Sequence, residues 1–382
     1  MKITKLMLSA LVAAAALVSC NKEDHDPVDT KVKSISISLG NAIMTKGVSD
    51  GKVTAGAVTV NSLRFFFLDN DGKNYKVYTF NNENQKVEAN TYIELSNTVP
   101  LSTTFEFHYV DPAVTKVAII ANVEENVQWD DVKNGYNLSI EGQQDPNELI
   151  LYGIDPELTV GEQKTHTNGD VTVLYTASVT LMPTVSRFEV DGFRIGFGTS
   201  PKFSKINITQ IAFQNYYPYS NAVTGEESGA LVSHFRNLDN ESYVFQDFEK
   251  FTTPTPWYTD KMNLELSSNV AVKKVGENGL SYHFFADDVV PEMVINMLVD
   301  GRPAYVYSEK INVVKNDGTT EQLTSLVPGR VYRMSAKGAV LNDDPDGYIK
   351  IPETKIDPAN HCIDITVDVV DWVVTLVQPE FK

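Results

Sequence analysis

Short segments in which apolar and polar residues alternate recur along this chain of 382 residues, and no long stretch has the 3.6-residue period of an amphipathic helix. Successive side chains of a β-strand point to opposite faces, so the alternation predicts strands with one buried face. Turn sequences such as Asp69-Asn70-Asp71-Gly72 and Asp111-Pro112 separate the segments. The pattern predicts an all-β fold.

The length suggests two domains, and we place the boundary near Met182-Pro183. Residues 32–182 and 183–382 are each expected to form an antiparallel β-sandwich or Greek-key domain. The expected strands cover residues 35–39, 63–68, 75–80, 104–110, 116–123, 171–181, 185–190, 193–197, 206–213, 243–248, 262–266, 280–285, 293–298, 304–314 and 331–336, before a C-terminal pair. Two short helices are expected, near 129–132 and within 228–237.

The C-terminal stretch 362–381 has the most regular alternation. Its apolar residues are Ile363, Ile365, Val367 and Val369, and after a one-residue slip they are Val370, Trp372, Val374 and Leu376. The slip predicts a bulge or bend near Asp371, between two successive strands. One interpretation is that these are the last strands of the domain. The other is that they are donated to a neighbouring molecule. An apolar strand at a chain end can pair with another molecule without a hinge loop, which favours this interpretation.

Residues 1–19 form a secretory signal peptide, in which Lys2 and Lys5 precede an apolar run that is too short to span a bilayer. It ends in Leu17-Val18-Ser19-Cys20, which resembles the lipobox of bacterial lipoproteins, where the cysteine is acylated and becomes the mature N-terminus. Several acyl chains on Cys20 would anchor a domain to a membrane without a spanning segment. Residues 20–31 are then a lipidated polar tether.

The chain is acidic, with a formal net charge of −18, and the loss of Lys2 and Lys5 with the signal peptide makes it −20. This charge argues against binding of nucleic acid or of anionic lipid through a basic patch. With Cys20 used as the anchor, Cys362 is the remaining cysteine, so an intramolecular disulfide or a cysteine metal site is excluded.

Signals for catalysis or cofactors are weak. The six histidines (His25, His108, His166, His234, His283 and His361) lack metal-ligand spacing, and no phosphate loop, nucleophile elbow or GxGxxG occurs. The acidic stretches 69–72 and 343–347 lack the full ladder of a calcium loop and are interpreted as turns. The aromatic loops at 215–219 and 256–258 either pack under a sandwich or stack on sugars. We therefore expect no enzyme activity and no cofactor.

The order and spacing of several segments resemble the fimbrillins, the type V pilus subunits of Bacteroidales, over the whole chain. They are Cys20-Asn21-Lys22-Glu23, residues 35–39, Thr45-Lys46-Gly47, residues 116–122, Val185-Ser186-Arg187-Phe188, Pro328-Gly329-Arg330-Val331-Tyr332 and Val370-Asp371-Trp372. The resemblance implies two transthyretin-like sandwiches, a location on the outer membrane and in a fimbrium, and a role in adhesion.

The resemblance also implies a mechanism of assembly with other fimbrial subunits. A first strand within 32–46, carrying Ile35, Ile37 and Leu39, is removed by a processing protease, and the C-terminal strands 362–381 of another subunit take its place. The cut is expected after Lys46 or Lys52, although the family uses arginine there and the first arginine here is Arg64. The open alternatives are an unprocessed anchor or tip subunit and a surface glycan-binding lipoprotein.

Overall fold

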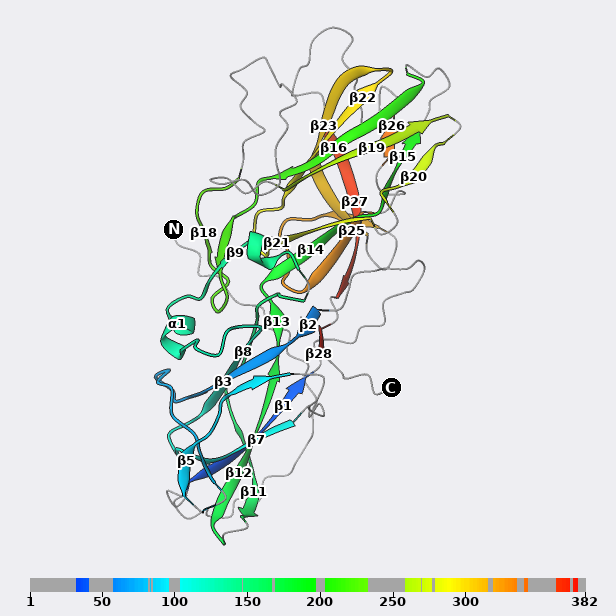
Figure 1. The fold of residues 1–382 in the computed structure, drawn as a ribbon. Coiled ribbons are helices and arrows are strands. Elements are labelled where there is room, and N and C mark those ends of the chain that lie inside the picture. Colours follow the sequence, from blue (N-terminus) through cyan, green and yellow to red (C-terminus); the bar gives the residue numbers. More distant parts are fainter. Residues whose placement is uncertain are drawn as a thin grey trace. The chain divides into compact units, whose positions relative to one another are not determined.

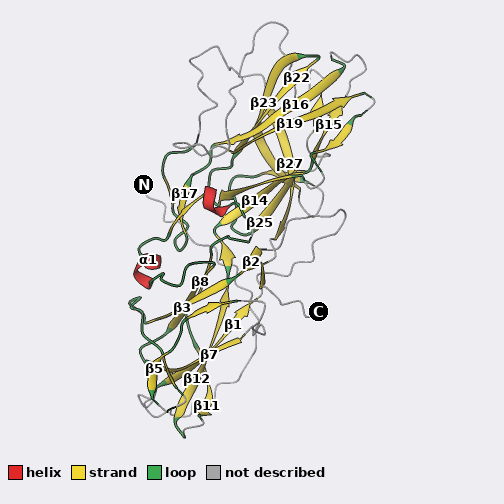
Figure 2. Ribbon diagram, viewed as in Figure 1, coloured by secondary structure: helices red, strands yellow, loops and turns green. Residues whose placement is uncertain are grey.

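The computed structural model describes residues 32–40, 58–81, 83, 85–95, 104–145, 147–166, 169–196, 203–232, 258–268, 270–276, 279–314, 319–334, 340–342, 362–371 and 374–376. Strands joined by turns make up most of the described chain, together with one short α-helix and one 3₁₀-helix (Figures 1 and 2). The all-β prediction is confirmed. Residues Val32–Lys382 belong to one compact unit.

Two sheets are built from the first half of the chain. The first has the order β11-β12-β1-β7, with β1 at Lys33–Gly40, β7 at Thr104–Val110, β11 at Thr159–Thr165 and β12 at Val171–Thr180. The second has the order β13-β10-β8-β3-β6, with β3 at Ser62–Leu68, β6 at Tyr92–Glu94, β8 at Lys116–Ala121, β10 at Leu151–Asp155 and β13 at Met182–Pro183.

These two sheets pack face to face through aromatic side chains. The ring of Phe65 on β3 lies 5.2 Å from Phe105 and 5.1 Å from Phe107, both on β7. At Gly153 on β10 the sheets approach so closely that a Cβ atom would lie 2.3 Å from the carbonyl oxygen of Thr180 on β12. Close aromatic packing of this kind stabilises a sandwich beyond the burial of area alone.

The helix α1, Trp129–Lys133, covers the other face of β3. Its Trp129 ring lies 5.2 Å from the ring of Phe66, which is 1% exposed. The short helix predicted at 129–132 is confirmed. Because α1 covers this face, the run Phe65-Phe66-Phe67 is buried on both sides of the sheet, and the simple alternation breaks down there.

The sequence around the turn Asp69–Gly72 also predicts a hairpin between 63–68 and 75–80. The turn forms, and Asp69 Oδ1 accepts hydrogen bonds from the backbone N–H groups of Asp71 and Lys73, each at 2.9 Å. The hairpin continues only to an antiparallel bridge between Leu68 and Asn74 and a 2.8 Å bond from the Tyr75 N–H to the Phe67 carbonyl oxygen. The rest of β3 pairs with β6 on one edge and with β8 on the other. β4 (Tyr78–Phe80) pairs with β5 (Lys86–Glu88).

The second half of the chain forms a sheet of nine strands. Its order is β19-β16-β22-β23-β27-β25-β14-β21, and β24 pairs with β23. The strands are β14 Val185–Val190, β16 Lys205–Gln214, β19 Tyr258–Ser267, β21 Leu280–Phe285, β22 Glu292–Val299, β23 Arg302–Val314, β24 Thr320–Gln322, β25 Arg330–Met334 and β27 Cys362–Asp371.

This sheet folds over on itself, and β27 forms the corner. Residues 362–367 of β27 pair with β23, whereas 368–371 pair with β25. Phe213 on β16 accordingly contacts strands of the other half of the sheet, with ring distances of 5.5 Å to Phe188 on β14 and 4.6 Å to Tyr282 on β21. The change of partner falls between Val367 and Asp368, whereas residues 368–371 pair with β25 without a register shift. The bulge or bend expected near Asp371 stays a prediction, because residues 372 and 373 lie outside the described residues.

Shorter elements complete the described fold. They are β2 Val58–Val60, β9 Asn137–Ser139, η1 Glu141–Gln143, β15 Gly192–Gly196, β17 Tyr219–Asn221, β18 Glu227–Ser228, β20 Val272–Lys274, β26 Val340–Asn342 and β28 Val374–Leu376. The helix predicted at 228–237 is wrong for the described residues up to Val232, because Ser228 ends β18 and Val232 bridges to Tyr216; residues 233–237 lie outside the described residues.

Five pairings among the described strands are parallel, namely β1–β12, β2–β28, β14–β25, β15–β26 and β23–β27. The antiparallel expectation holds for the other pairs. β1 and β27 come from segments near the chain ends, so no hairpin fixes their direction. At the predicted boundary, the consecutive strands β13 and β14 belong to different sheets, since β13 pairs with β10 and β14 pairs with β21. The division into two domains stays a prediction.

A polar cluster lies buried beneath β14 and β21. Glu189 accepts hydrogen bonds from Arg187 at 2.7 Å and from Arg333 at 2.9 Å, and Arg187 Nη1 lies 3.2 Å from His283 Nε2. His283 Nδ1 lies 2.6 Å from the carbonyl oxygen of Gln143 on η1. Burial lowers the pKa of His283 to about 3, and the nearby guanidinium of Arg187 acts in the same direction.

Candidate functional site

The first strand, β1, lies in the interior of a sheet rather than at its edge (Figure 1). It pairs in parallel with β12, from Lys33 opposite Val173 to Gly40 opposite Thr180. On its other side it pairs antiparallel with β7, with a register shift between Lys33 and Ile35. β1 therefore fills a slot between β7 and β12, and its backbone completes the hydrogen bonding of both.

The apolar side chains of the predicted first strand point into the core. Ile35 and Ile37 are fully buried, and Leu39 is partly buried against the same core. Each fully buried aliphatic side chain of this size stabilises the folded state by about 1.5 to 3 kcal/mol. The slot thus offers two closed apolar sites and one half-open site, each two residues from the next.

A polar cluster closes one end of the slot. Ser34, which is completely buried, has its Oγ 2.6 Å from Thr172 Oγ1, 3.1 Å from His108 Nδ1 and 3.4 Å from His166 Nε2. The two imidazole rings lie 4.6 Å apart at an interplanar angle of 70°. We call Ser34, His108, His166 and Thr172 the hydroxyl–imidazole cluster.

The residue before this cluster is also tied to the slot. Lys33 is 9% exposed, and its Nζ donates a 2.7 Å hydrogen bond to the carbonyl oxygen of Val114. The same ammonium group lies 4.6 Å from the ring centre of Tyr175 on β12. Burial lowers the pKa of Lys33, while the charge of Asp111 opposes the shift.

Charged groups surround the cluster on its open side. Glu106 on β7 bonds to Lys164 on β11, which lowers the pKa of Glu106, and its Oε2 is 4.0 Å from His108 Nε2. Burial lowers the pKa of His108, as do His166 and Lys164, whereas Glu106 raises it. Sequence reasoning missed this cluster, because 58 residues separate its two histidines and only the pairing of β1 with β7 and β12 joins them.

The predicted donor residues fall on the last two strands. Ile363, Ile365, Val367, Val369 and Val370 belong to β27, and Val374 and Leu376 belong to β28. β28 pairs in parallel with β2. Their donation to another molecule stays a prediction. Trp372 lies outside the described residues, as do Cys20 and the predicted cleavage residues Lys46 and Lys52.

The other motifs of the sequence do not form a recognisable catalytic or metal site where they are described. Among the described residues, no three His, Cys, Asp or Glu side chains are arranged to hold a metal ion. The carboxylate of Asp69 is used within its own turn and by Tyr75, 3.1 Å away. Residues 343–347 lie outside the described residues. None of the helices in the described part has the length and hydrophobicity to cross a membrane.

The aromatic loops are buried in part where they are described. Tyr216 is 2% exposed and Tyr258 is fully buried, with their rings 5.0 Å apart, so both belong to the core. Tyr217 is half-buried and Tyr219 is 46% exposed, while Pro256 and Trp257 lie outside the described residues.

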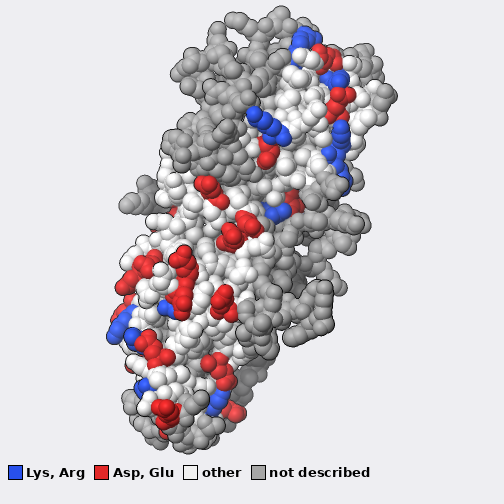
Figure 3. All heavy atoms as spheres, viewed as in Figure 1, with Lys and Arg blue, Asp and Glu red and all other residues white. Residues whose placement is uncertain are grey.

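On the face drawn in Figure 3, Asp and Glu side chains are scattered mainly over its lower part, and Lys and Arg side chains gather mainly at its upper right.

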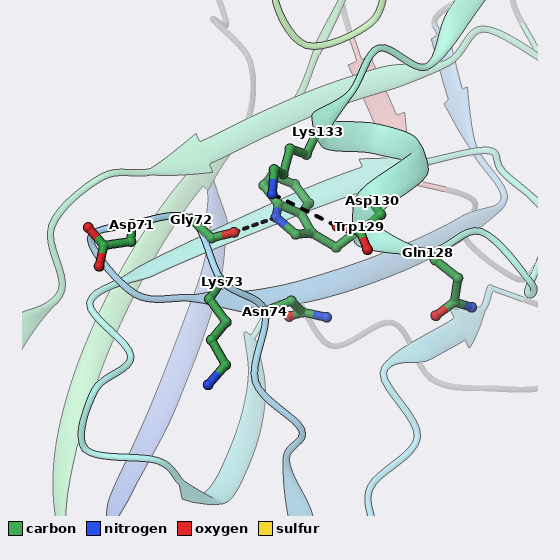
Figure 4. A pocket seen from close by; sticks show the side chains of 8 residues that line it. All are labelled: Asp71, Gly72, Lys73, Asn74, Gln128, Trp129, Asp130 and Lys133. Atoms are coloured by element: carbon green, nitrogen blue, oxygen red, sulfur yellow. Dashed lines mark hydrogen bonds and ion pairs between the residues drawn. The ribbon is translucent and has the colours of Figure 1, made fainter.

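A polar hollow of about 380 Å³ lies between the 71–74 turn and α1 (Figure 4). The indole Nε1 of Trp129 donates a 2.7 Å hydrogen bond to the carbonyl oxygen of Gly72, and the other side of the hollow holds an Asp130–Lys133 ion pair at 3.9 Å. Because the Trp129 ring packs on Phe66, it fastens the turn to the helix and does not offer a free face to a sugar.

The sequence matches no protein-family model and no curated protein. The structure is similar to that of a fimbrilin, FimA, from Porphyromonas gingivalis, with 12% identity, a TM-score of 0.49 and coverage of 90% of this chain and 98% of the other. A protein assigned to cell adhesion from Parabacteroides distasonis has the same identity and TM-score, with coverage of 92% and 100%. At this identity and with TM-scores below 0.5, these likenesses do not assign a function by themselves.

Proposed function

We propose that this chain is a structural subunit of a bacterial surface fimbria that polymerises by donor-strand exchange and supports adhesion. The observation that carries the proposal is the place of β1. It is a short segment near the chain's start, and it lies between β7 and β12 with Ile35 and Ile37 fully buried. Such a strand can leave without unthreading the rest of the sheet.

Departure of β1 would leave two strands with unpaired backbone groups and an exposed apolar groove. Unpaired N–H and C=O groups at a strand edge bind extended segments of other chains, and apolar sites two residues apart select an alternating strand. The slot is therefore suited to accept a strand from a second molecule. Because the accepting and donating surfaces differ, the contact repeats head to tail and builds a filament.

The C-terminal strands supply the donor in this proposal. β27 has the required alternation at Ile363, Ile365, Val367 and Val369, and β28 continues it after the sheet change. Within the described chain β27 lies between β23 and β25, and β28 pairs with β2. In this proposal the slot of the second molecule replaces these pairings when the strands are donated.

Export and processing complete the proposal. Acylation of Cys20 anchors the precursor to the outer membrane, and a surface protease cuts after Lys46 or Lys52 to free β1. If the segment is not cut, the chain remains a lipid-anchored terminal subunit, which is the alternative role. The buried positions of Tyr216 and Tyr258 give no support to the glycan-binding alternative.

Limited trypsin digestion of the purified, unlipidated chain tests the proposal. We expect an early cut after Lys46 or Lys52, followed by oligomers that survive unheated denaturing electrophoresis and disappear on boiling. The double variant Lys46→Gln, Lys52→Gln is the control and should stay monomeric. A variant truncated before Cys362, which lacks both proposed donor strands, should be cut without forming long oligomers. A cut wild-type chain that remains monomeric would refute polymerisation and favour the anchor role.

A further inference from the structure

We propose that the hydroxyl–imidazole cluster is the specificity-determining end of the slot, and that in the assembled filament it receives Asp364 of a second copy of this chain. This inference rests on the donor-strand exchange proposed above and adds the register and the contact that fix the incoming strand.

The slot imposes a pattern on any strand that replaces β1. Positions 35, 37 and 39 require apolar side chains, whereas position 38 faces solvent and position 36 is half-buried. Position 34 differs from these outward positions, because His108, His166 and Thr172 cover it. His166 and Thr172 also bond to each other at 2.9 Å, so an occupant without a hydrogen-bonding group would chiefly deprive His108 Nδ1 of its partner. The loss of one such hydrogen bond weakens binding by about tenfold.

The C-terminal strands match this pattern best in one register. With the direction of β1 kept, Ile365, Val367 and Val369 take the positions of Ile35, Ile37 and Leu39, and Thr366 and Asp368 take the outward positions. Asp364 then takes the place of Ser34. A shift by two residues also keeps the alternation, but it places Cys362, a weak hydrogen-bonding group, at the cluster.

The other placements differ in direction or in the apolar series that fills the core. In the opposite direction, the first series brings Val370 or Asp368 to the polar end, and the second series brings Val377 or Thr375 there. In the forward direction, the second series brings Val369 or Asp371 to the cluster and leaves Val373 at an outward position.

Of these placements, the reversed register with Asp368 at the cluster also keeps polar side chains at both outward positions, Thr366 and Asp364. Keeping the direction of β1, parallel to β12 and antiparallel to β7, selects Asp364 instead. The Asp368→Ala peptide tests the reversed register.

A carboxylate suits the cluster better than the hydroxyl that it replaces. Hydrogen bonds between a carboxylate and an imidazolium are charge-assisted and about twice as strong as neutral ones. The His108 side chain keeps 27% of its surface exposed, so it has room to move aside for a side chain longer than serine. When the donor strand replaces β1, the neutral hydrogen bond between Ser34 and His108 would thus give way to a stronger bond between Asp364 of the second copy and His108.

The charges around the cluster give this contact a pH dependence. Glu106 on β7 competes for His108, Lys164 on β11 neutralises Glu106, and Asp170 accepts a hydrogen bond from Tyr109 at 3.2 Å beside His166. Lys33, whose Nζ lies 4.6 Å from the centre of the Tyr175 ring on β12, leaves with β1. An entering carboxylate beside His108 favours its protonated form, so binding of the donor tightens as the pH falls from 8 to 6.

Peptide exchange into the full chain tests the inference. A specific protease site replaces residues 47–50, the chain is cut there, and fluorescent peptides spanning residues 361–371 are added under reducing conditions. Fluorescence anisotropy measures their binding. We expect the Asp364→Ala peptide to bind about tenfold more weakly than the wild-type peptide, and the Asp368→Ala peptide, altered at an outward position, to bind within about twofold of it. In the His108→Gln chain, the difference between the wild-type and Asp364→Ala peptides should shrink.

The outcomes separate the two proposals. A labelled β1 peptide, residues 32–41, reports that the slot can be entered. If it exchanges while none of the C-terminal peptides binds, donor-strand exchange by this segment is refuted. If the wild-type and Asp364→Ala peptides bind equally, or if Cys362→Ala is the change that weakens binding, the assignment of Asp364 is overturned while strand exchange stands. A wild-type affinity that does not change between pH 8 and pH 6 also contradicts it.

Discussion

His283 is an imidazole held between a guanidinium and a backbone carbonyl. Its Nε2 lies 3.2 Å from Arg187 and its Nδ1 lies 2.6 Å from the carbonyl oxygen of Gln143. Protonation there would add a second buried cation beside Arg187, and this explains why the pKa falls to about 3. The neutral form is therefore part of what holds η1 against β21.

The folded protein should lose stability in acid through His283. In the unfolded chain the imidazole takes up a proton near pH 6.5, but in the folded chain it does so near pH 3. Between these values the unfolded state binds more protons, so the free energy of unfolding falls as the pH is lowered, by at most about 1.4 kcal/mol per pH unit. Urea denaturation at several pH values measures the slope, which should be smaller in His283→Gln. An equal slope in both proteins would contradict the assignment.

Single residues also show which features of the structure can be predicted from the sequence and which cannot. The inward direction of Ile35 and Ile37 follows from alternation alone, and the structure confirms it. The burial of Ser34 does not, because it depends on His108 and His166, which reach it from two other strands. Phe66 is a second example, since its burial requires α1, which lies far along the chain. Local patterns predict a strand's two faces but not what covers them.

At the scale of elements, β1 gains most of its stability from one face. Ile37→Ala should lower the free energy of unfolding by about 2 to 4 kcal/mol, because Ile37 is fully buried in the core and its truncation leaves a cavity there. Ser36→Ala, on the opposite face of the same strand, should change it by less than about 0.5 kcal/mol. Urea denaturation of both variants makes the comparison. Similar losses in the two would show that β1 is held by its backbone and not by its apolar side chains.

The ranges of the strands were easier to predict than their partners. β3, β7, β12, β14, β16 and β22 all lie close to the expected residues. The hairpin expected after β3 forms only next to its turn, where Leu68 bridges to Asn74, and the rest of β3 pairs with β6 and β8. The slip of the alternation in β27 lies within the residues paired with β25, so it did not locate the change of partner between Val367 and Asp368.

At the scale of the whole molecule, the proposed attachment to the membrane depends on Cys20, one of the chain's two cysteines. Cys20→Ser should abolish the incorporation of labelled fatty acid, because the thiol is the acylated group in the proposed lipobox. Cys362→Ser, the matched control, should leave labelling unchanged, since Cys362 belongs to β27. Growth of cells with labelled fatty acid, followed by electrophoresis, distinguishes the two variants. Fatty acid retained in the Cys20→Ser protein would refute lipid anchoring at this position.

The placement of β1 beside β12 also sets the order of events in the life of the chain. β1 is synthesised first, yet its slot exists only after β7 and β12 have been made, so its docking is a late, long-range step of folding. While β1 remains covalently linked, its local concentration at the slot is in the millimolar range typical of short tethers, and a strand from another molecule cannot compete. A single peptide-bond cleavage removes that advantage. In the proposed assembly, the intact peptide link between β1 and the rest of the chain would thus keep subunits monomeric until the processing protease cuts it.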